Sequence, residues 1–360
     1  MAGGRGERFW PVSREKMPKH LITLFGNRSF LQQAVDRVRA LVPAENILVI
    51  TNATQAAAAR KQLPELPAGN VIAEPVGRDT CPAVALGAAV AGQRSTNAVM
   101  AVLPADQVIP EEKKFQQVLA DCFDLAGRGQ VMVTIGIKPT EPATGYGYIR
   151  VGNALPAPEG AKYQTAFFKA EQFVEKPNFE RAQEYVSSGQ YRWNAGMFVW
   201  SFVTITQGLE KHQPELAAAC RRWFEAAGTR KLDKVLAADY PALAKISIDY
   251  ALMEKAQNVV VADGAFEWDD LGSWTALGRH LPADAAGNCA QGEFIEVGSE
   301  GNIVFDARTK NRTPIALVGM RHCILVQTDD AVLLVHKSQA QKVKEMVRKM
   351  AEDKEYKKLV

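Results

Sequence analysis

The sequence predicts an α/β protein in which a Rossmann-like, doubly wound mixed sheet is followed by a small β-rich domain. The first half of the chain alternates strand-like and helix-like segments, as such sheets do. A loop rich in Pro, Asp, Asn and Gly at residues 282–292 then precedes a series of short strands. A chain of 360 residues is long enough for two domains. We expect them at residues 1–282 and 283–360.

The first half supplies the strands and helices of the predicted sheet. Short, β-branched apolar runs are typical of buried strands, and apolar residues at helical spacing are typical of helices. The expected helices cover residues 30–41, 53–63 and 113–126, and the expected strands cover 46–51, 98–103 and 131–137. Ligands of such sheets bind beyond the carboxyl ends of the strands. Asp106, which follows the strand at 98–103, would lie at such an end.

The pattern becomes richer in strands after residue 144. Strands are expected at 148–151, 167–175, 197–200 and 259–262, with helices at 204–224, 231–236 and 248–255. In the second domain, strands are expected at 294–297, 302–306, 315–319, 323–328 and 331–336. Such repeated short strands form a small sandwich or a solenoid-like β-helix.

A basic amphipathic helix is expected over residues 338–360, with Val343, Met346, Val347 and Met350 along one stripe. We expect this stripe to pack on the β-rich domain. Binding to a membrane surface is the alternative.

Composition narrows the class of protein. The chain is 47% apolar and 23% charged, as in ordinary globular proteins, and its net charge of +3 indicates neither a nucleic-acid nor a membrane partner. Its longest apolar stretch, residues 83–91, is too short to span a bilayer, and the N-terminus lacks the pattern of a signal peptide. The five cysteines are scattered without a C-x-x-C pair, which favours reduced thiols and a cytoplasmic location.

The N-terminal loop has the composition of a phosphate-binding site. Gly3, Gly4 and Gly6 allow close backbone approach and positive φ, and successive N–H groups in such a turn form an anion-binding concavity. Arg8 and Lys19 add positive charge. The loop is neither a dinucleotide-binding fingerprint nor a Walker A loop, because the third glycine and the Gly-Lys-Ser/Thr are missing. A tight surface turn is the alternative reading.

The stretch GGRGERFWPVSREKMPK at residues 3–19 resembles the signature loop of the sugar-1-phosphate nucleotidyltransferases, which have a GT-A-like fold. Its FWP and SR are similar to the mannose-1-phosphate guanylyltransferase branch. The resemblance implies that Ala2, Gly3, Gly4 and Gly6 contact the nucleotide, and that Arg8 and Lys19 contact the triphosphate. It also implies a buried strand that ends near the first residue, so we expect this strand to be truncated here.

The segment EPVGRDTCPA at residues 74–83 reads locally as a polar turn that opens a helix, with Asp79 or Thr80 as N-cap. It also resembles the E-P-x-G-R-D-T-A-P-A segment of the same branch, with Cys81 in place of Ala. That resemblance implies guanine selection. A site that recognises guanine needs hydrogen-bond acceptors for the N1–H and the N2 amine of the base. The residues it assigns to nucleotide binding are Glu74, Gly77, Arg78, Asp79 and Thr80.

Two aspartates are candidates for Mg²⁺ ligands, since Mg²⁺ prefers carboxylate and phosphate oxygens. Asp106 ends LPAD, which resembles the family's L-P-A-D-H motif with Gln107 in place of His. WDDLGSW at residues 268–274 resembles W-x-D-x-G-S-W, and this alignment assigns the second carboxylate to Asp270 rather than Asp269. Capping of a turn is the alternative for Asp106, and a solvated turn is the alternative for the later pair.

Three further segments resemble the sugar-binding blocks of the family: PATGYGYI at 142–149, FVEKP at 173–177 and WNAGMF at 193–198. Glycine at position 147 allows a hexose to lie against the backbone. Glu175 and Asn194 can hydrogen-bond hydroxyl groups, and Lys176 can pair with a phosphate. Taken singly, each segment is better explained as core or turn, but the three in family order are not.

Together these segments imply a mannose-1-phosphate guanylyltransferase. Such an enzyme uses Mg²⁺ to convert GTP and mannose 1-phosphate into GDP-mannose and diphosphate by in-line attack. Arg8, Lys19, Asp106 and Asp270 would act in catalysis, and the β-rich domain would support a homodimer. One alternative is a nucleotidyltransferase for another sugar phosphate or nucleotide. The other is a non-catalytic, sugar-nucleotide-binding regulatory subunit.

Overall fold

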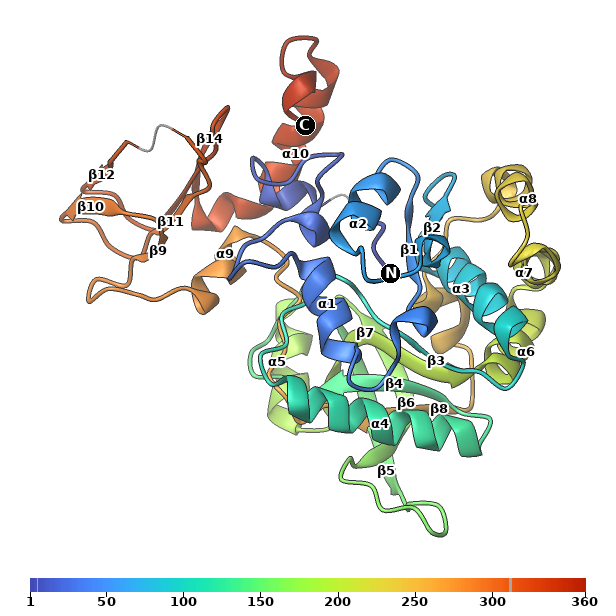
Figure 1. Ribbon diagram of the computed structural model, residues 1–360. Coiled ribbons are helices and arrows are strands. Elements are labelled where there is room, and N and C mark those ends of the chain that lie inside the picture. Colours follow the sequence, from blue (N-terminus) through green and yellow to red (C-terminus); the bar gives the residue numbers. More distant parts are fainter. Residues whose placement is uncertain (5, 311–312) are drawn as a thin grey trace. The chain divides into compact units, whose positions relative to one another are not determined.

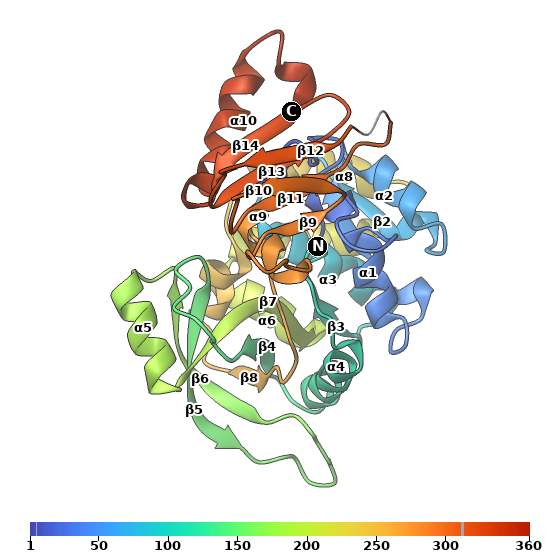
Figure 2. The same cartoon turned by 90° about the vertical axis from the view of Figure 1, so that its left-hand side faces the viewer.

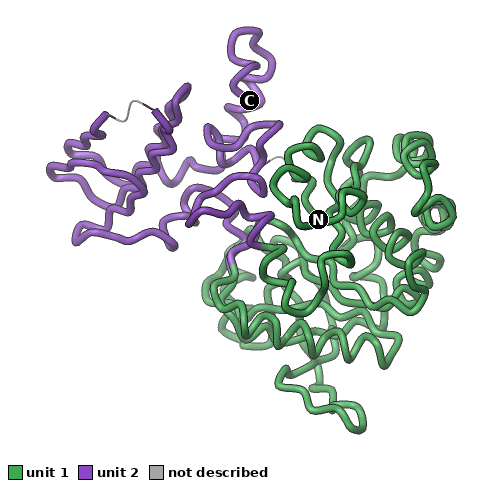
Figure 3. The backbone as a smooth tube through the Cα atoms, viewed as in Figure 1, with its two compact units in different colours: residues 1–3, 34–105, 109–268 green, residues 4–33, 106–108, 269–360 purple. Residues whose placement is uncertain are grey.

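The structure is a computed structural model that describes residues 1–4, 6–310 and 313–360 (Figures 1 and 2). It contains two compact units, coloured separately in Figure 3. Unit 1 comprises Met1–Gly3, Ala34–Ala105 and Ile109–Trp268, and unit 2 comprises Gly4–Gln33, Asp106–Val108 and Asp269–Val360. The chain thus passes between the units several times, so the units do not coincide with the division at residue 282.

The elements alternate along the chain, as expected for an α/β protein (Figure 1). The helices include α1 Phe30–Val38, α2 Ala56–Gln62, α3 Thr80–Arg94, α4 Glu112–Arg128, α5 Phe179–Ser188, α6 Phe202–His212, α7 Pro214–Ala226, α8 Leu232–Asp239, α9 Trp274–Leu277 and α10 Val343–Glu352. The strands include β1 Val49–Asn52, β2 Val71–Glu74, β3 Val99–Val102, β4 Met132–Ile137, β5 Gly147–Leu155, β6 Phe167–Glu175, β7 Tyr191–Ser201, β8 Val259–Asp263, β9 Cys289–Gln291, β10 Phe294–Val297, β11 Ile303–Asp306, β12 Ile315–Val318, β13 Cys323–Gln327 and β14 Val332–His336.

Unit 1 is built around a mixed sheet with the strand order β3-β7-β4-β8-β6-β5. β4 and β8 are parallel, whereas β7 runs antiparallel to both β3 and β4. β1 and β2 form a separate parallel pair. Helix α4 packs against strands of the sheet, and α3, α6 and α7 pack together. The predicted α/β fold with a mixed sheet is confirmed.

The first two residues of unit 1 hydrogen-bond to β1 and to the segment that directly follows β3. The Ala2 amide donates to the Ile50 carbonyl in β1 over 2.8 Å. The Met1 amino group donates to the Leu103 carbonyl over 2.8 Å, and the Ala105 amide donates to the Met1 carbonyl over 3.0 Å. These bonds fix the start of the glycine loop against the ends of β1 and β3.

Unit 2 contains a two-sided coil of short strands, stacked as Figure 2 shows. On one side β9, β11 and β13 are parallel, and β14 adds antiparallel to β13; on the other side β10 and β12 are parallel. The β-rich domain is therefore the solenoid-like β-helix rather than a sandwich. Val343 and Val347 of α10 are buried in the same apolar cluster as Ile303 and Ile324. The helix itself contacts the N-terminal segment Glu7–Phe9 of the same unit more than it contacts the strands, so the expected packing on the β-rich domain is only partly what the structure has.

A ladder of buried asparagines holds successive turns of the coil together. The Asn302 side-chain amide donates to Asn288 Oδ1 and to the Met320 carbonyl, both over 2.9 Å. Its Oδ1 accepts from the Cys323 amide, also over 2.9 Å. Because Asn302 is only 1% exposed, water cannot replace these bonds.

Several boundaries differ from the sequence-based expectations. The expected helix at 204–224 is two helices, since Pro214 starts α7 after a break at Gln213. The helix expected at 248–255 is a π-helical segment, Asp249–Met253, and α10 is shorter than residues 338–360. Strand β9 lies within the stretch that was expected to be a loop, and β2 and α5 were not foreseen.

Within the described residues, none of the helices has the length and apolar character required to cross a membrane. All five cysteines are free thiols.

Replacing Asn302 with Ala is expected to lower the free energy of unfolding by about 3 kcal/mol, because it leaves buried donors and acceptors without partners. The measurement is urea unfolding followed by circular dichroism. Asn97→Ala, at an exposed position, is the matched control and should change stability by less than about 0.5 kcal/mol. Equal unfolding midpoints for the two variants would rule out the ladder as a stabilising feature.

Candidate functional site

The predicted site residues fall in both units. Three of the predicted motifs contain a point where the chain passes from one unit to the other. These points are Gly3–Gly4 in the glycine loop, Ala105–Asp106 in LPAD, and Trp268–Asp269 in WDDLGSW.

In unit 2, Lys19 joins the two predicted metal carboxylate segments. Its Nζ lies 3.1 Å from Asp106 Oδ2 and donates to the main-chain carbonyl of Asp270 over 2.5 Å. The side chain is 8% exposed and passes between the rings of Phe9 and Phe30, whose centroids lie 5.7 and 5.6 Å from Nζ. The aromatic walls and the carboxylate stabilise a cation that would be costly to bury alone.

Gly6 explains how Lys19 reaches this position. Gly6 has φ of 63°, and a Cβ built on it would lie 2.6 Å from both Cβ and the backbone nitrogen of Lys19. Glycine is therefore required for two reasons, the left-handed backbone and the close approach of Lys19. Arg8 follows in the same loop; its side chain is exposed, and its Nη1 donates to the Gly272 carbonyl over 3.0 Å.

Asp269 and Asp270 are neighbours with different roles. Asp269 is buried, and its Oδ2 accepts from Arg279 and His280 while its Oδ1 accepts from the Leu271 amide. Burial acts to raise the pKa of Asp269, but these hydrogen bonds outweigh it and the pKa is lowered. Both carboxylate oxygens of Asp269 thus have hydrogen-bond partners within the protein, and these bonds hold the loop in place.

In Asp270, by contrast, one carboxylate oxygen accepts no hydrogen bond from the described residues. Its Oδ1 is inaccessible to water and has no hydrogen-bond partner among the described residues. Burial raises the pKa of Asp270, and the nearby Asp106 adds to the effect while Lys19 opposes it. An orphaned buried carboxylate oxygen costs free energy unless a proton or a cation satisfies it.

By this criterion Asp270 fits a magnesium ion, and Asp106, which pairs with Lys19, is the second carboxylate near it. The described residues contain no group of three or more Asp, Glu, His or Cys side chains that could hold a metal ion alone. Magnesium in nucleotide-processing sites is commonly held by one or two carboxylates together with substrate phosphates. The donor set therefore suits an ion that arrives with a phosphorylated substrate.

In unit 1, Glu74 ends strand β2 and lies beside Gly3. A Cβ built on Gly3 would lie 3.5 Å from Glu74 Oε2. Glu74 is 5% exposed, and neither its Oε1 nor the buried Tyr240 hydroxyl has a hydrogen-bond partner of normal geometry among the described residues. Burial raises the pKa of Glu74 to about 7; the nearby Tyr240 hydroxyl lowers it slightly.

The rest of the 74–83 segment is fixed by hydrogen bonds. Asp79, one of the two N-cap residues that the sequence offered, caps α3 by accepting from the Thr80 amide over 2.8 Å. Arg78 donates from Nε to the Tyr240 carbonyl over 3.1 Å and from Nη2 to the Pro241 carbonyl. Gly77 is exposed, and a Cβ there would meet nothing within 4 Å.

The predicted sugar-binding residues of unit 1 lie together. Gly147 and Glu175 are partners in the β5–β6 register, and a Cβ on Gly147 would lie 2.6 Å from Glu175 Oε2 and 3.5 Å from the Asn194 Cβ. Lys176 forms an ion pair with Glu175 over 2.8 Å. Only glycine at 147 permits this arrangement of the polar side chains.

Backbone strain concentrates at these motifs. Four non-glycine residues among those described have positive φ: Asp79, Lys176, Leu271 and His322. Three of them belong to, or directly follow, a predicted site residue. Asp79, with φ of 67° and ψ of −168°, occupies a region that is nearly exclusive to glycine. Such strain gathers where a site requires a particular backbone geometry.

Sequence reasoning missed two residues that contact this group in unit 1. Tyr240 lies beside Glu74, and Asp249 accepts a hydrogen bond from Asn194. The available signal for Asp249 was an acidic residue within the otherwise uncharged stretch ISIDYALM.

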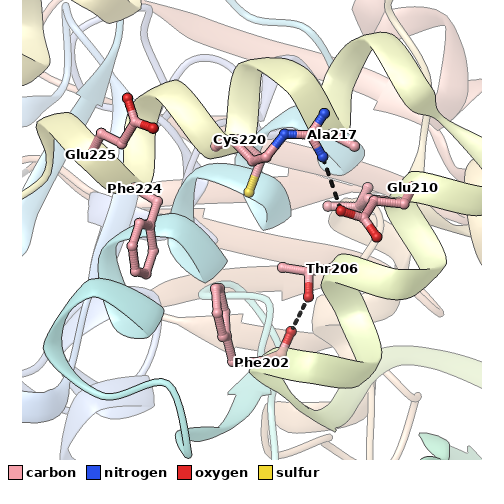
Figure 4. Close-up of a pocket in the computed structure, with 9 residues that line it drawn as sticks. Phe202, Thr206, Glu210, Ala217, Cys220, Phe224 and Glu225 are labelled. Atoms are coloured by element: carbon pink, nitrogen blue, oxygen red, sulfur yellow. Dashed lines mark hydrogen bonds and ion pairs between the residues drawn. The ribbon is translucent and has the colours of Figure 1, made fainter.

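A separate pocket of about 370 Å³ lies between α6 and α7 (Figure 4). Apolar groups such as Phe202 and Phe224 line it, and the ion pair of Arg221 with Glu210 lies at its side. None of the predicted site residues lines this pocket, so the pocket is no evidence for where the predicted site lies.

Comparison with known proteins accounts for both parts of the chain. The nucleotidyl transferase family model matches residues 1–286, and the model of the MannoseP isomerase/GMP-like β-helix domain matches residues 292–350. A mannose-1-phosphate guanylyltransferase of Salmonella montevideo is 40% identical over 97% of this chain and 73% of its own length. One from Escherichia coli is 37% identical over 96% of this chain and 72% of its own length.

A solved structure shows the same likeness in three dimensions. A crystal structure described as a mannose-1-phosphate geranyltransferase from Thermus thermophilus matches with a TM-score of 0.83 and 36% identity. The match covers 97% of this chain and 97% of that one. Because the family model spans most of the chain and the relatives match almost all of it, the chain belongs to the nucleotidyl transferase family.

Proposed function

We propose that this chain is a mannose-1-phosphate guanylyltransferase, which forms GDP-mannose and diphosphate from GTP and mannose 1-phosphate. The observation that carries the proposal is the 40% identity to such an enzyme over almost the whole chain. The Lys19–Asp106–Asp270 cluster supports it, because it brings a cation and two carboxylates together in unit 2.

The reaction needs positioning and charge neutralisation more than proton transfer. A phosphate oxygen of mannose 1-phosphate attacks the α-phosphorus of GTP, and the bond to the β-phosphate oxygen breaks as diphosphate leaves. Because the nucleophile is already an anion, no general base is required. Lys19 and Arg8 would stabilise the negative charge on the departing diphosphate, and Lys176 would pair with the sugar phosphate.

Asp106 and Asp270 would hold Mg²⁺. When bound, the ion neutralises charge on the reacting phosphates. The spare, buried Oδ1 of Asp270 supports this role.

Most of the residues that would recognise the substrates lie in unit 1, whereas Gly4 and Gly6 belong to unit 2. The Glu74 carboxylate would accept from N1–H and the N2 amine of guanine, which suits an acceptor without a protein partner. Backbone groups of Ala2, Gly3, Gly4 and Gly6 would approach the phosphates. Glu175 and Asn194 would bind hydroxyl groups of the mannose beside Gly147.

We also propose a cytoplasmic homodimer. The free thiols suit a reducing compartment. On the β10–β12 pair, Ile295, Val297 and Val318 are 62%, 64% and 72% exposed, and Val297 lies opposite Val318. An apolar face of this kind favours burial against a second copy.

The purified chain with Mg²⁺ and mannose 1-phosphate is expected to release diphosphate with GTP, and at least about 100-fold less with ATP, UTP or dTTP. A site that hydrogen-bonds one base leaves polar groups unpaired with another. A coupled diphosphate assay measures this, with glucose 1-phosphate as the competing sugar. Preference for another nucleotide or sugar would favour a related transferase. GDP-mannose binding without turnover would favour a regulatory subunit.

Asp270→Asn is expected to lower kcat by about 100-fold or more, because it removes charge that would hold the ion on the phosphates. The measurement is steady-state turnover over a range of Mg²⁺ concentrations; chelation by EDTA should abolish wild-type turnover reversibly. Asp233→Asn, at an exposed position, is the control and should leave kcat unchanged. Normal turnover by Asp270→Asn would refute the metal role.

The affinity for GTP is expected to fall as pH drops through about 7, because protonated Glu74 can no longer accept two hydrogen bonds from guanine. The substrate phosphates also titrate in this range, so the measurement compares the pH profile of kcat/KM for GTP with that of Glu74→Gln. The difference between the profiles reports Glu74 alone. Parallel profiles would show that this carboxyl group does not contact the base.

A further inference from the structure

Asp249 belongs to none of the motifs that suggested the site, yet it contacts one of the proposed sugar-binding residues. The Asn194 side-chain amide donates from Nδ2 to Asp249 Oδ1 over 2.7 Å. Asp249 begins the π-helical segment Asp249–Met253, and Asn194 lies in β7. This contact thus joins two elements that are far apart in the sequence.

The contacts of Asn194 fix which way its amide points. Asn194 Oδ1 accepts from the Gly196 amide over 3.2 Å and from the Thr134 hydroxyl over 3.4 Å. A carboxylate only accepts, and a backbone N–H only donates. Exchange of the amide oxygen and nitrogen would therefore place like groups against both Asp249 and Gly196.

This orientation leaves one polar group for a ligand. Among the described residues, Asn194 Nδ2 has only Asp249 as hydrogen-bond partner. Its second N–H is thus available to a hydroxyl oxygen. Glu175 lies close enough to add to the effect of burial in raising the pKa of Asp249, so acidic groups gather at this point.

The segment that carries Asp249 is itself held in place. The Ile248 amide donates to the Thr80 hydroxyl over 2.8 Å. The Cys81 amide donates to the Ile246 carbonyl over 3.1 Å, and the Ile246 amide donates to the Arg78 carbonyl over 3.3 Å. These bonds to the 74–83 segment leave the start of the π-helical turn little freedom.

We propose that Asp249 is a positioning residue of the sugar-phosphate site: by accepting from Asn194 Nδ2, it holds the amide so that the remaining N–H faces the mannose. The proposal rests on the proposed function and adds a residue to it. Asp249 acts through Asn194 and makes no contact with the reacting phosphates.

The kinetic test compares Asp249→Ala, Asp249→Asn and Asn194→Ala. Asp249→Ala is expected to raise KM for mannose 1-phosphate about tenfold, since it removes a hydrogen bond to a charged acceptor, with KM for GTP unchanged. Asp249→Asn keeps an acceptor at the same place and should stay within about threefold of the wild type. Asp249→Ala combined with Asn194→Ala should be no worse than Asn194→Ala alone, because both act through one amide.

Glu254→Gln is the matched control. Glu254 is an exposed acidic residue just beyond the same π-helical turn and lies within electrostatic reach of Asp249. Its loss of charge should leave KM for mannose 1-phosphate unchanged. Equal rises in both KM values, additive effects in the double variant, or no rescue by Asp249→Asn would overturn the proposal.

A second readout does not depend on turnover. In the protein labelled with ¹⁵N-asparagine, the Asn194 side-chain amide should exchange slowly with solvent in the wild type and in Asp249→Asn, and faster in Asp249→Ala. Unchanged exchange in Asp249→Ala would overturn the proposal. If the wild type fails to release diphosphate, the proposed function fails, while the exchange experiment still decides whether Asp249 orients this amide.

Discussion

The arrangement of charged groups in unit 2 depends on one buried ammonium group. Two carboxylate-bearing segments that are far apart in the sequence converge there, and like charges repel each other in a poorly hydrated environment. Lys19 compensates by contacting Asp106 Oδ2 and the Asp270 carbonyl. Its own position depends on Gly6, because a Cβ at Gly6 would collide with the Lys19 backbone. A glycine in the loop thus leaves room for the lysine that contacts both aspartate-bearing segments.

Much of this could be predicted from the sequence, and the failures have physical reasons. Long elements such as α4 and β6 could be predicted because the spacing of their apolar residues reflects burial on one face. Segment 204–224 looked continuous because both helices are amphipathic; only Pro214 marks the break. Strand β9 was missed because three residues next to a Gly- and Asn-rich turn carry no measurable period. Residues such as Asp106, Glu175 and Asn194 were named because their motifs resemble those of the family, whereas their residue types alone also fit a turn or the core.

The residues that were missed contact predicted site residues. Asp249 and Tyr240 lie in segments that read as helix or core, and their importance depends on what the fold brings next to them. Asn194 and Asp249 are separated by 55 positions, and no local pattern connects them. Backbone strain cannot be predicted from a sequence either. An aspartate at position 79 looks like an ordinary helix cap, whereas the structure shows that it caps the helix from a conformation that favours glycine.

The burial of Glu74 also has a consequence for how the protein exchanges protons with its surroundings. A carboxyl group whose pKa lies near 7 is about half protonated at neutral pH. A ligand that donates hydrogen bonds to it favours the ionised form, so binding would expel the proton into solvent. The heat of nucleotide binding would then include the ionisation enthalpy of whichever buffer takes up that proton. The same protein would therefore give different calorimetric enthalpies in phosphate and in Tris.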